Sequence, residues 1–397
     1  APAPRLRRPV AAALLTALVV AGGSAADSVL LAQVGVLLAA GLIVAGLWAR
    51  LGTRGLRVSI LPSRERLTAG ETLTIDVELR NRLRLPRPRI DLRVRSDLGP
   101  AIGWTTSLSP NGRSHLRTTI RCPLRGVYAL GPAGVSSPDP LEIFEGRRAV
   151  GERREVVVYP PCPRLPHFIL PAGRRGASGA RGRVAGGPIV AGVREYTPGD
   201  PPQRIHWPLS LRQSRLVVRT LEDDPDAGVC WIALDLCAAD QHADPAALEA
   251  GVIAAAALAQ HALEQGRPVG FLASGARQHW LPPVPGRGQL RPILEELAYA
   301  QPRGGTPFSR LLVSRLGVQS RNGLLIAITA APAGVGITGR MLGLQPSQIV
   351  LVRLSSDRGR GPAPARRALP GDLPAEEYVV TPTTPIAEAL ASGRAGR

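Results

Sequence analysis

Two long apolar runs open the chain, at residues 10–26 and 28–48, and only Asp27 separates them. A helix needs about 20 apolar residues to cross the hydrocarbon core of a bilayer. The second run has 21 residues and meets this length, whereas the first has 17 and is slightly short. The pattern predicts a hairpin of two transmembrane helices within residues 1–49.

Arginines flank this hairpin on both outer sides, as Arg5, Arg7 and Arg8 before it and Arg50, Arg54 and Arg57 after it. Basic residues next to membrane spans favour the cytoplasmic side. We therefore expect both termini and all soluble domains to be cytoplasmic, at the inner or plasma membrane. A cleaved signal peptide, with the first arginines as its basic region, is the alternative. The second apolar run directly behind the first argues against it.

Residues 50–160 change to a period of two. Apolar Leu73, Ile75, Val77 and Leu79 alternate with polar residues, and Ile90, Leu92 and Val94 repeat the alternation. Turn sequences such as 109–112 (SPNG) separate these short runs. Alternation with regular turns predicts a small β-sandwich-like domain.

A glycine- and arginine-rich stretch, residues 172–187, lies in a predicted linker over 161–190. This composition is typical of flexible linkers. A loop that binds anionic lipids or a partner is the alternative interpretation, and a solvated linker is the simpler one.

Beyond the linker, residues 229–356 alternate strand and helix patterns. Short apolar runs at 229–235, 269–273, 324–329 and 349–354 are typical of buried parallel strands. Helical patterns follow Asp244-Pro245 and cover 289–299 and 307–316, with a short helix near Met341. The pattern predicts a doubly wound α/β domain, with sites at the carboxyl ends of its strands. Residues 357–397 are rich in Arg, Pro and Gly, and we expect a flexible tail there.

The amino-acid composition excludes several classes of catalytic mechanism. All 49 basic residues are arginines, so no mechanism that needs a lysine is available. The formal charge of +19 reflects in part a GC-rich coding bias, since arginine without lysine accompanies 44 Gly and 39 Pro. The few aromatic residues are not interleaved with the arginines, and we expect no nucleic-acid partner. Cys230 and Cys237 flank a predicted buried strand and are expected in the core, and the six histidines share no motif.

Several motifs carry a family resemblance. Residues 194–200 (REYTPGD), 204–207 (RIHW) and 216–219 (LVVR) form a hallmark segment within 191–228, and 125–128 (RGVY), 137–141 (SPDPL) and 158–160 (VYP) accompany it upstream. Together with the hairpin, these segments resemble the family called domain of unknown function 58. The resemblance implies that residues 229–356 form a von Willebrand factor A-like domain.

Such domains often carry a metal-ion-dependent adhesion site. The corresponding positions are Asp235, Cys237, Ala239, Thr306 and Ala330. Two serines and one aspartate of the family pattern are missing, so only Asp235 and Thr306 remain as ligands. Mg²⁺ requires near-octahedral oxygen coordination. We therefore predict no functional metal at this degenerate site, and no cofactor.

The hallmark segment allows two interpretations. Its residues Arg194, Tyr196, Gly199, Asp200, Arg204, His206 and Trp207 form either an internal packing and ion-pair motif or a surface that docks a partner. Internal packing is the simpler interpretation. Family members usually have Asp or Asn where His206 stands.

A glycine motif formed by Gly334, Gly336 and Gly339 has the spacing of a dinucleotide-binding fingerprint, with Asp357 further on. Four residues separate it from the preceding strand, where the fingerprint needs a tight turn. A nucleotide-dependent enzyme is therefore a weak alternative.

The favoured hypothesis is a non-enzymatic, membrane-anchored adaptor or scaffold. The resemblance implies work with a MoxR-type AAA+ ATPase and with a transglutaminase-like membrane protein, in assembly or maturation of a protein complex. An outward-facing adhesion or cell-envelope protein is the other alternative, and it requires the opposite topology.

Overall fold

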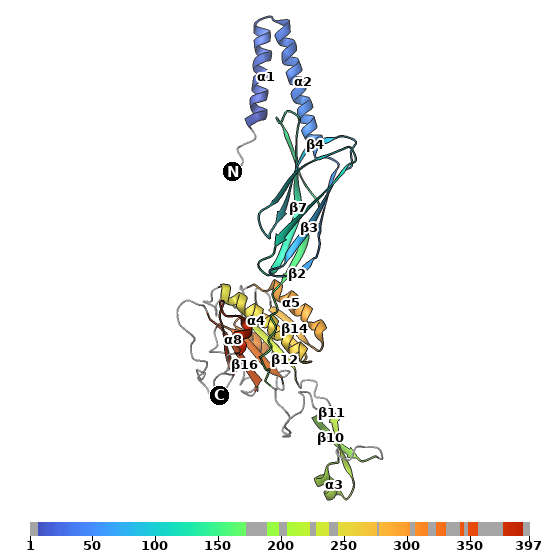
Figure 1. Cartoon of the computed structure of the whole chain (residues 1–397), viewed down its shortest axis with the longest axis vertical. Coiled ribbons are helices and arrows are strands. Elements are labelled where there is room, and N and C mark those ends of the chain that lie inside the picture. The colour runs from blue at the N-terminus through green and yellow to red at the C-terminus, as the bar shows by residue number, and fades with distance from the viewer. Residues whose placement is uncertain are drawn as a thin grey trace. The chain divides into compact units, whose positions relative to one another are not determined.

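The structure is a computed structural model of the 397-residue chain (Figure 1). It describes residues 7–171, 189–197, 205–222, 228–237, 245–275, 278–301, 306–316, 323–330, 342–344, 348–355 and 376–391. The chain divides into two units, Ala1–Val158 and Tyr159–Arg397.

Two antiparallel helices open the first unit, α1 (Arg7–Ala25) and α2 (Val29–Gly52). Both are long and apolar enough to span a membrane, and most of their apolar side chains are exposed. Small residues let the helices approach closely, since a Cβ on Gly35 would lie 2.5 Å from Cγ2 of Val20. Ser28 begins α2 as an N-cap and accepts a hydrogen bond from the backbone of Leu31. The predicted membrane hairpin is thus supported by length, composition and packing.

Two antiparallel sheets follow and enclose one core, so the predicted sandwich is present. The first sheet has the order β1 (Leu56–Pro62), β3 (Thr72–Asn81), β6 (Arg113–Arg121). The second has the order β2 (Arg66–Thr68), β9 (Arg154–Tyr159), β7 (Gly126–Pro138), β4 (Arg87–Ser96), β5 (Ile102–Leu108), with β8 (Glu145–Val150) paired to β7. The alternating apolar residues of β3 and β4 are buried in the core between the sheets, as their period of two predicts.

A buried arginine joins α2 to the sandwich. Arg87 begins β4, is only 1% exposed, and its guanidinium donates hydrogen bonds to the carbonyls of Leu51 (2.8 Å) and Arg54 (3.3 Å). The last carbonyls of a helix have no partner within the helix and carry its partial negative charge. Burial lowers the pKa of Arg87, because desolvation disfavours the charged form. The end of α2 and the turn after it therefore offer two acceptors to one guanidinium nitrogen of Arg87, whereas its Nε is buried and makes no hydrogen bond among the described residues.

Small residues complete this junction. Any Cβ at Gly146 in β8 would collide with the carbonyl oxygen of Ala49, and one at Gly52 would lie 3.0 Å from the hydroxyl of Ser137. The last turns of α2 therefore pack directly on β7 and β8.

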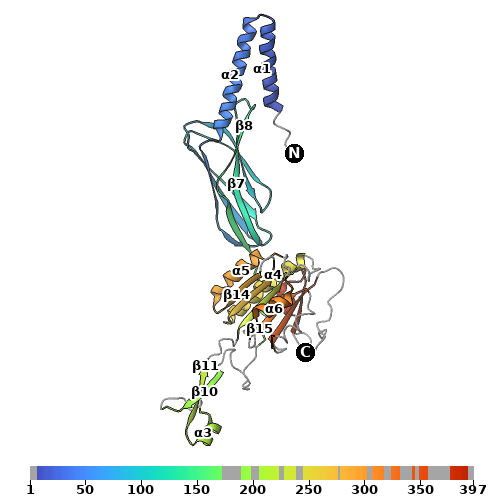
Figure 2. The ribbon, with the colours of Figure 1, turned by 180° about the vertical axis from the view of Figure 1, so that it is seen from behind.

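A six-stranded sheet forms the centre of the second unit. Its order is β14 (Gln278–Val284), β13 (Val269–Ser274), β12 (Cys230–Asp235), β15 (Leu324–Thr329), β16 (Ile349–Leu354), β17 (Glu376–Val380). All neighbouring pairs are parallel except β13 and β14. Helices α4 (Pro245–Glu264), α5 (Leu290–Tyr299) and α8 (Ile386–Ala391) share the core of one face, and α6 (Phe308–Leu316) shares that of the other (Figures 1 and 2). The predicted mixed α/β character is confirmed.

The predicted flexible tail over 357–397 is wrong for residues 376–391. β17 pairs in parallel with β16, and α8 packs into the core of the same face as α4. Residues 356–375, which lie outside the described residues, are rich in Arg, Pro and Gly. The prediction extended this composition to the short apolar segments that follow them.

The predicted linker over 161–190 is also wrong at its start. Leu165, Phe168 and Leu170 are buried in the core under α4. The Phe168 ring lies 5.4 Å from that of Tyr378 in β17, edge to face, and 5.7 Å from that of His261. The glycine- and arginine-rich residues 172–187 lie outside the described residues.

Arg87→Ala tests the junction. The change removes the guanidinium donor to the carbonyls of Leu51 and Arg54, while the backbone N–H of Arg54 still donates to the Leu51 carbonyl (3.0 Å). We expect a cost of about 1–3 kcal/mol of local stability. Backbone amides around residues 51–56 should then exchange hydrogen about 5- to 150-fold faster, measured by mass spectrometry on the full chain in detergent. Arg57→Ala, on an exposed side chain of β1, is the control. Equal exchange in both variants would contradict the capping role.

Candidate functional site

The hallmark segment forms a small hairpin with a helix between its strands. β10 (Ile189–Glu195) pairs antiparallel with β11 (Val217–Glu222), and α3 (Trp207–Gln213) lies between them in the chain. The backbone amide of Tyr196 donates to Leu216 (2.9 Å), and that of His206 donates to Val217 (2.8 Å). Tyr196 and His206 are ten residues apart in the sequence. These two bonds hold both of them beside the start of β11.

His206 is the N-cap of α3. Its Nδ1 accepts a hydrogen bond from the backbone N–H of Leu209 (3.3 Å). The buried Ser210 hydroxyl accepts from the N–H of Val217 (2.9 Å) and so ties the helix to β11. The imidazole thus fills the capping role that Asp and Asn side chains commonly fill at helix N-termini.

An exposed apolar surface lies on α3. Trp207 is 57% exposed and Leu211 is 79% exposed. The two are four residues apart and therefore share one face of the helix. Leu216, just before β11, is also exposed. Trp207 was predicted as a possible docking residue, whereas Leu211 was not, although it lies four residues further along the chain.

Among the other hallmark residues, the structure describes Arg194 and Tyr196. Arg194 donates to the hydroxyl of Thr197 (2.9 Å) and to the carbonyl of Glu195 (3.2 Å), and Tyr196 is half-buried. The structure thus places Arg194 in a local bond network beside the hairpin. Gly199, Asp200 and Arg204 lie outside the described residues, and so do the glycine motif and Met341.

Asp235 forms the second candidate site, at the carboxyl end of β12. It is fully buried, and its Oδ1 accepts hydrogen bonds from the hydroxyl of Ser274 (3.1 Å) and the backbone N–H of Cys237 (3.0 Å). Its Oδ2 accepts from the hydroxyl of Thr329 (2.7 Å). Ser274 ends β13 and Thr329 ends β15, the two strands beside β12. Three adjacent strand ends therefore hold one buried carboxylate.

Ser274 and Thr329 were not predicted as site residues. Each is the polar residue that closes an otherwise apolar strand, and the carboxyl ends of parallel strands meet at one edge of the sheet. That signal could have found both, but the partner strands of β12 follow only from the sheet order.

This arrangement does not fit a bound divalent cation. Ser274 and Thr329 direct their hydroxyl protons at the carboxylate oxygens that a metal would need. Thr306 is half-buried two residues before α6, and among the described residues no hydrogen bond joins it to Asp235. Ala330 follows β15 as predicted but has no ligand atom in its side chain, and Ala239 lies outside the described residues. Within the described part of the chain, no three His, Cys, Asp or Glu residues gather as metal ligands.

The cysteines are core residues. Cys230 and Cys237 are buried, as predicted. Burial raises the pKa of the Cys230 thiol to about 12 and that of Cys162 to about 11. Both thiols therefore stay protonated near neutral pH and are poor nucleophiles.

A histidine–carboxylate pair was not predicted either. Nδ1 of the buried His279 in β14 contacts the carboxylate of Glu296 in α5. This pair fixes the edge strand to the helix that covers it. Nε2 of His279 is buried and makes no hydrogen bond among the described residues.

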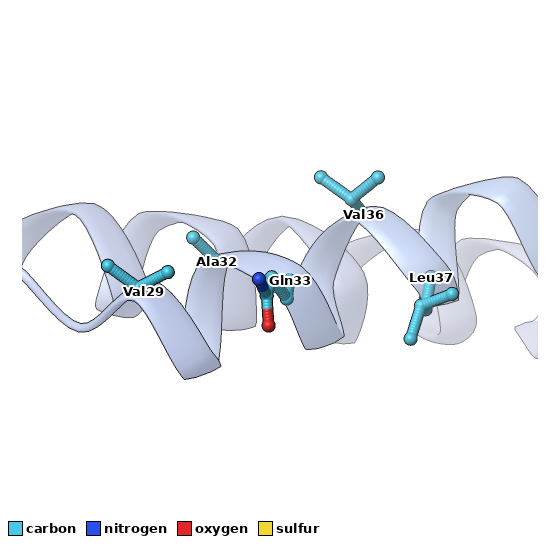
Figure 3. A pocket seen from close by; sticks show the side chains of 5 residues that line it. All are labelled: Val29, Ala32, Gln33, Val36 and Leu37. Carbon is cyan, nitrogen blue, oxygen red and sulfur yellow. The ribbon is translucent and has the colours of Figure 1, made fainter.

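A hollow of ≈ 500 Å³ on α2 is lined by Val29, Ala32, Gln33, Val36 and Leu37 (Figure 3). These side chains lie on the exposed face of a helix that is apolar enough to span a membrane. In a bilayer the hollow would face acyl chains, so it does not suit a polar substrate.

The hallmark segment and the strands that follow it are similar to a known protein family. Residues 192–330 match the family described as "Protein of unknown function DUF58". This match confirms the resemblance predicted from the motifs. "Uncharacterized protein YeaD" of Bacillus subtilis (strain 168) is 24% identical over 294 residues, which cover 70% of this chain and 71% of that protein.

Two solved structures show weak likeness. The crystal structure of the CARDB domain of PF1109 from Pyrococcus furiosus is 20% identical, covers 26% of this chain and 91% of its own, and has a TM-score of 0.21. The sporulation control protein Spo0M of Bacillus subtilis is 12% identical, with coverages of 26% and 49% and a TM-score of 0.19. At such scores neither likeness bears on function.

Asp235→Ala tests whether the carboxylate is structural. The change removes the carboxylate that accepts hydrogen bonds from two hydroxyls and an amide, and it should lower the free energy of unfolding of the α/β domain by about 3 kcal/mol. Because no metal is expected, millimolar Mg²⁺ should leave the unfolding temperature of the parent and the variant unchanged in calorimetry. Thr306→Ala is the control and should change neither quantity. A Mg²⁺-dependent stabilisation of the parent that Asp235→Ala abolishes would contradict the prediction.

Proposed function

We propose that this protein is a non-enzymatic, membrane-anchored adaptor that docks a protein partner through α3. One observation supports this proposal most directly: Trp207 and Leu211 are both largely exposed on one face of a helix. Tryptophan is enriched among the residues that dominate binding energies. Isolated exposed apolar residues are ordinary, whereas two large ones on one face suit an interface.

The helix is held firmly enough to serve as a docking element. Ser210 bonds it to β11, and His206 caps its first turn. A preformed surface loses less conformational entropy on binding than a disordered one. The N-cap of α3 and its hydrogen bond to β11 thus favour a role for its exposed side chains in binding a partner.

Residues 229–356 are proposed to form a von Willebrand factor A-like domain whose contacts do not use a metal. Its strand order, with one antiparallel strand at the edge beside β13, supports this proposal. The carboxylate of Asp235 is occupied by protein donors, so a partner would bind through side chains and not through a bridging cation.

The partner proposed from the family resemblance is a MoxR-type AAA+ ATPase, with a transglutaminase-like membrane protein as a second associate. The arginines on both flanks of the helical hairpin support a cytoplasmic location for the docking surface. An ATPase that uses cytoplasmic ATP could reach it there.

Trp207→Ala with Leu211→Ala tests the docking surface. The full-length protein is crosslinked briefly in its native cells with ATP present, purified in mild detergent, and analysed for associated proteins by mass spectrometry. We expect enrichment of an AAA+ ATPase with the parent and at least a ~10-fold loss with the double variant, since an aromatic anchor contributes about 2 kcal/mol or more.

Trp280→Ala is the matched control, because Trp280 is an exposed tryptophan on β14, away from the hallmark. It should leave recovery unchanged. Recovery of the parent without any partner, or equal recovery with the double variant, would contradict the docking role.

Protease treatment of intact cells tests the topology. If the hairpin has both ends inside, the α/β domain should resist external protease and become sensitive after the membrane is permeabilised. Cleavage in intact cells would instead support the outward-facing adhesion or cell-envelope alternative.

A further inference from the structure

The loop between β7 and β8 is a rigid turn held by a buried carboxylate. Oδ1 of Asp139 accepts hydrogen bonds from the backbone N–H groups of Ile143 (2.7 Å) and Phe144 (3.2 Å). Asp139 is only 2% exposed, and its own N–H donates to the carbonyl of Phe144 (3.1 Å). These bonds leave the apolar Leu141 at the tip, with 66% of its surface exposed.

The same loop lies beside the end of the membrane hairpin (Figure 1). The ring of Phe144 would be 4.0 Å from a Cβ on Gly46 of α2. Glu142 pairs with Arg8, in the first turn of α1, at 3.5 Å and with Arg89 of the sandwich at 2.6 Å. The loop is thus tied to both helices where they meet the sandwich.

The position of these contacts along α2 sets the depth of the loop. α2 has 24 residues and is about 36 Å long, slightly more than the ~30 Å hydrocarbon core. Its apolar run ends at Trp48, and Arg50 is the first charged residue. Phe144 therefore lies level with the last apolar turn, where the hydrocarbon gives way to headgroups.

The charges around the loop suit an anionic bilayer surface. Arg50, Arg54 and Arg148 are exposed, and within the described part of the chain none of them pairs with a carboxylate. Arg148 lies two residues after Gly146, which touches α2. Unpaired arginines at this level can bind lipid phosphates, as basic residues beside membrane helices do.

We propose that the loop over residues 139–144 is a membrane-interface wedge. Leu141 enters the boundary between headgroups and acyl chains, and Arg50, Arg54 and Arg148 bind the phosphates of anionic lipids. The wedge, together with the Arg87 junction, holds the sandwich at a defined height and tilt on the bilayer. This inference rests on the membrane anchor of the proposed function and is independent of the docking surface and of the side on which the domains lie.

Leu141→Trp tests the wedge in the full-length protein, reconstituted into vesicles of phosphatidylcholine and phosphatidylglycerol. The added tryptophan should emit at shorter wavelength than in water. Lipids brominated near the headgroup should quench its emission, measured as the difference from the parent. In vesicles of phosphatidylcholine alone the quenching should weaken, since the arginines then have no anionic lipid to bind.

Leu124→Trp is the matched control, because Leu124 is a similarly exposed leucine just before the other end of β7. Its added emission should stay unquenched. Equal quenching at both positions, or none at 141, would overturn the wedge, and a blue shift at 141 without quenching would mean that protein covers the loop. Trp48 in α2 reports the anchor separately: its share of the quenching, measured as the difference between the parent and Trp48→Phe, shows that the helices are inserted even if the wedge fails.

Discussion

A buried arginine that caps a helix is the interaction on which the first unit depends. An unpaired cation in a protein interior is costly, and so are helix carbonyls without donors. Arg87 donates to two carbonyls at and just after the end of α2, and these bonds tie the helix end to the first residue of β4. Gly52 and Gly146 add to this junction, because a Cβ at either position would press against the facing segment. Anchor and sandwich are for this reason one body.

The same principle governs the α/β domain, with the sign of the charge reversed. Asp235 is a buried anion, and hydroxyls from two neighbouring strand ends and one amide satisfy it. The hydrogen bonds that its two oxygens accept join the carboxyl ends of β12, β13 and β15. On α3, by contrast, Trp207 and Leu211 are largely exposed, and no described residue covers them.

Much of the fold was predictable because its elements have strong local patterns. The membrane helices, the alternating strands of the sandwich and the buried strands of the α/β sheet all follow from hydrophobic periodicity. The buried residues at the start of the linker and the last strand and helix were not predicted. Phe168 and Tyr378 stand in segments without a clear hydrophobic pattern, and only the fold packs their rings edge to face. At the sites, Asp235, Trp207 and His206 were identified from motifs, whereas Arg87, Ser274, Thr329 and Leu211 were not.

The sequence by itself determined which segments are apolar, where the family hallmark lies and which residue types the chain lacks, such as lysine. These are properties of single positions or of neighbours along the chain. Only the tertiary structure decided what becomes of the buried charges, because their partners are remote: 36 residues separate Arg87 from Leu51, and 94 separate Asp235 from Thr329. A charge far from its partner in sequence has no local pattern. Its cost in the interior is met only by the groups that the fold places beside it.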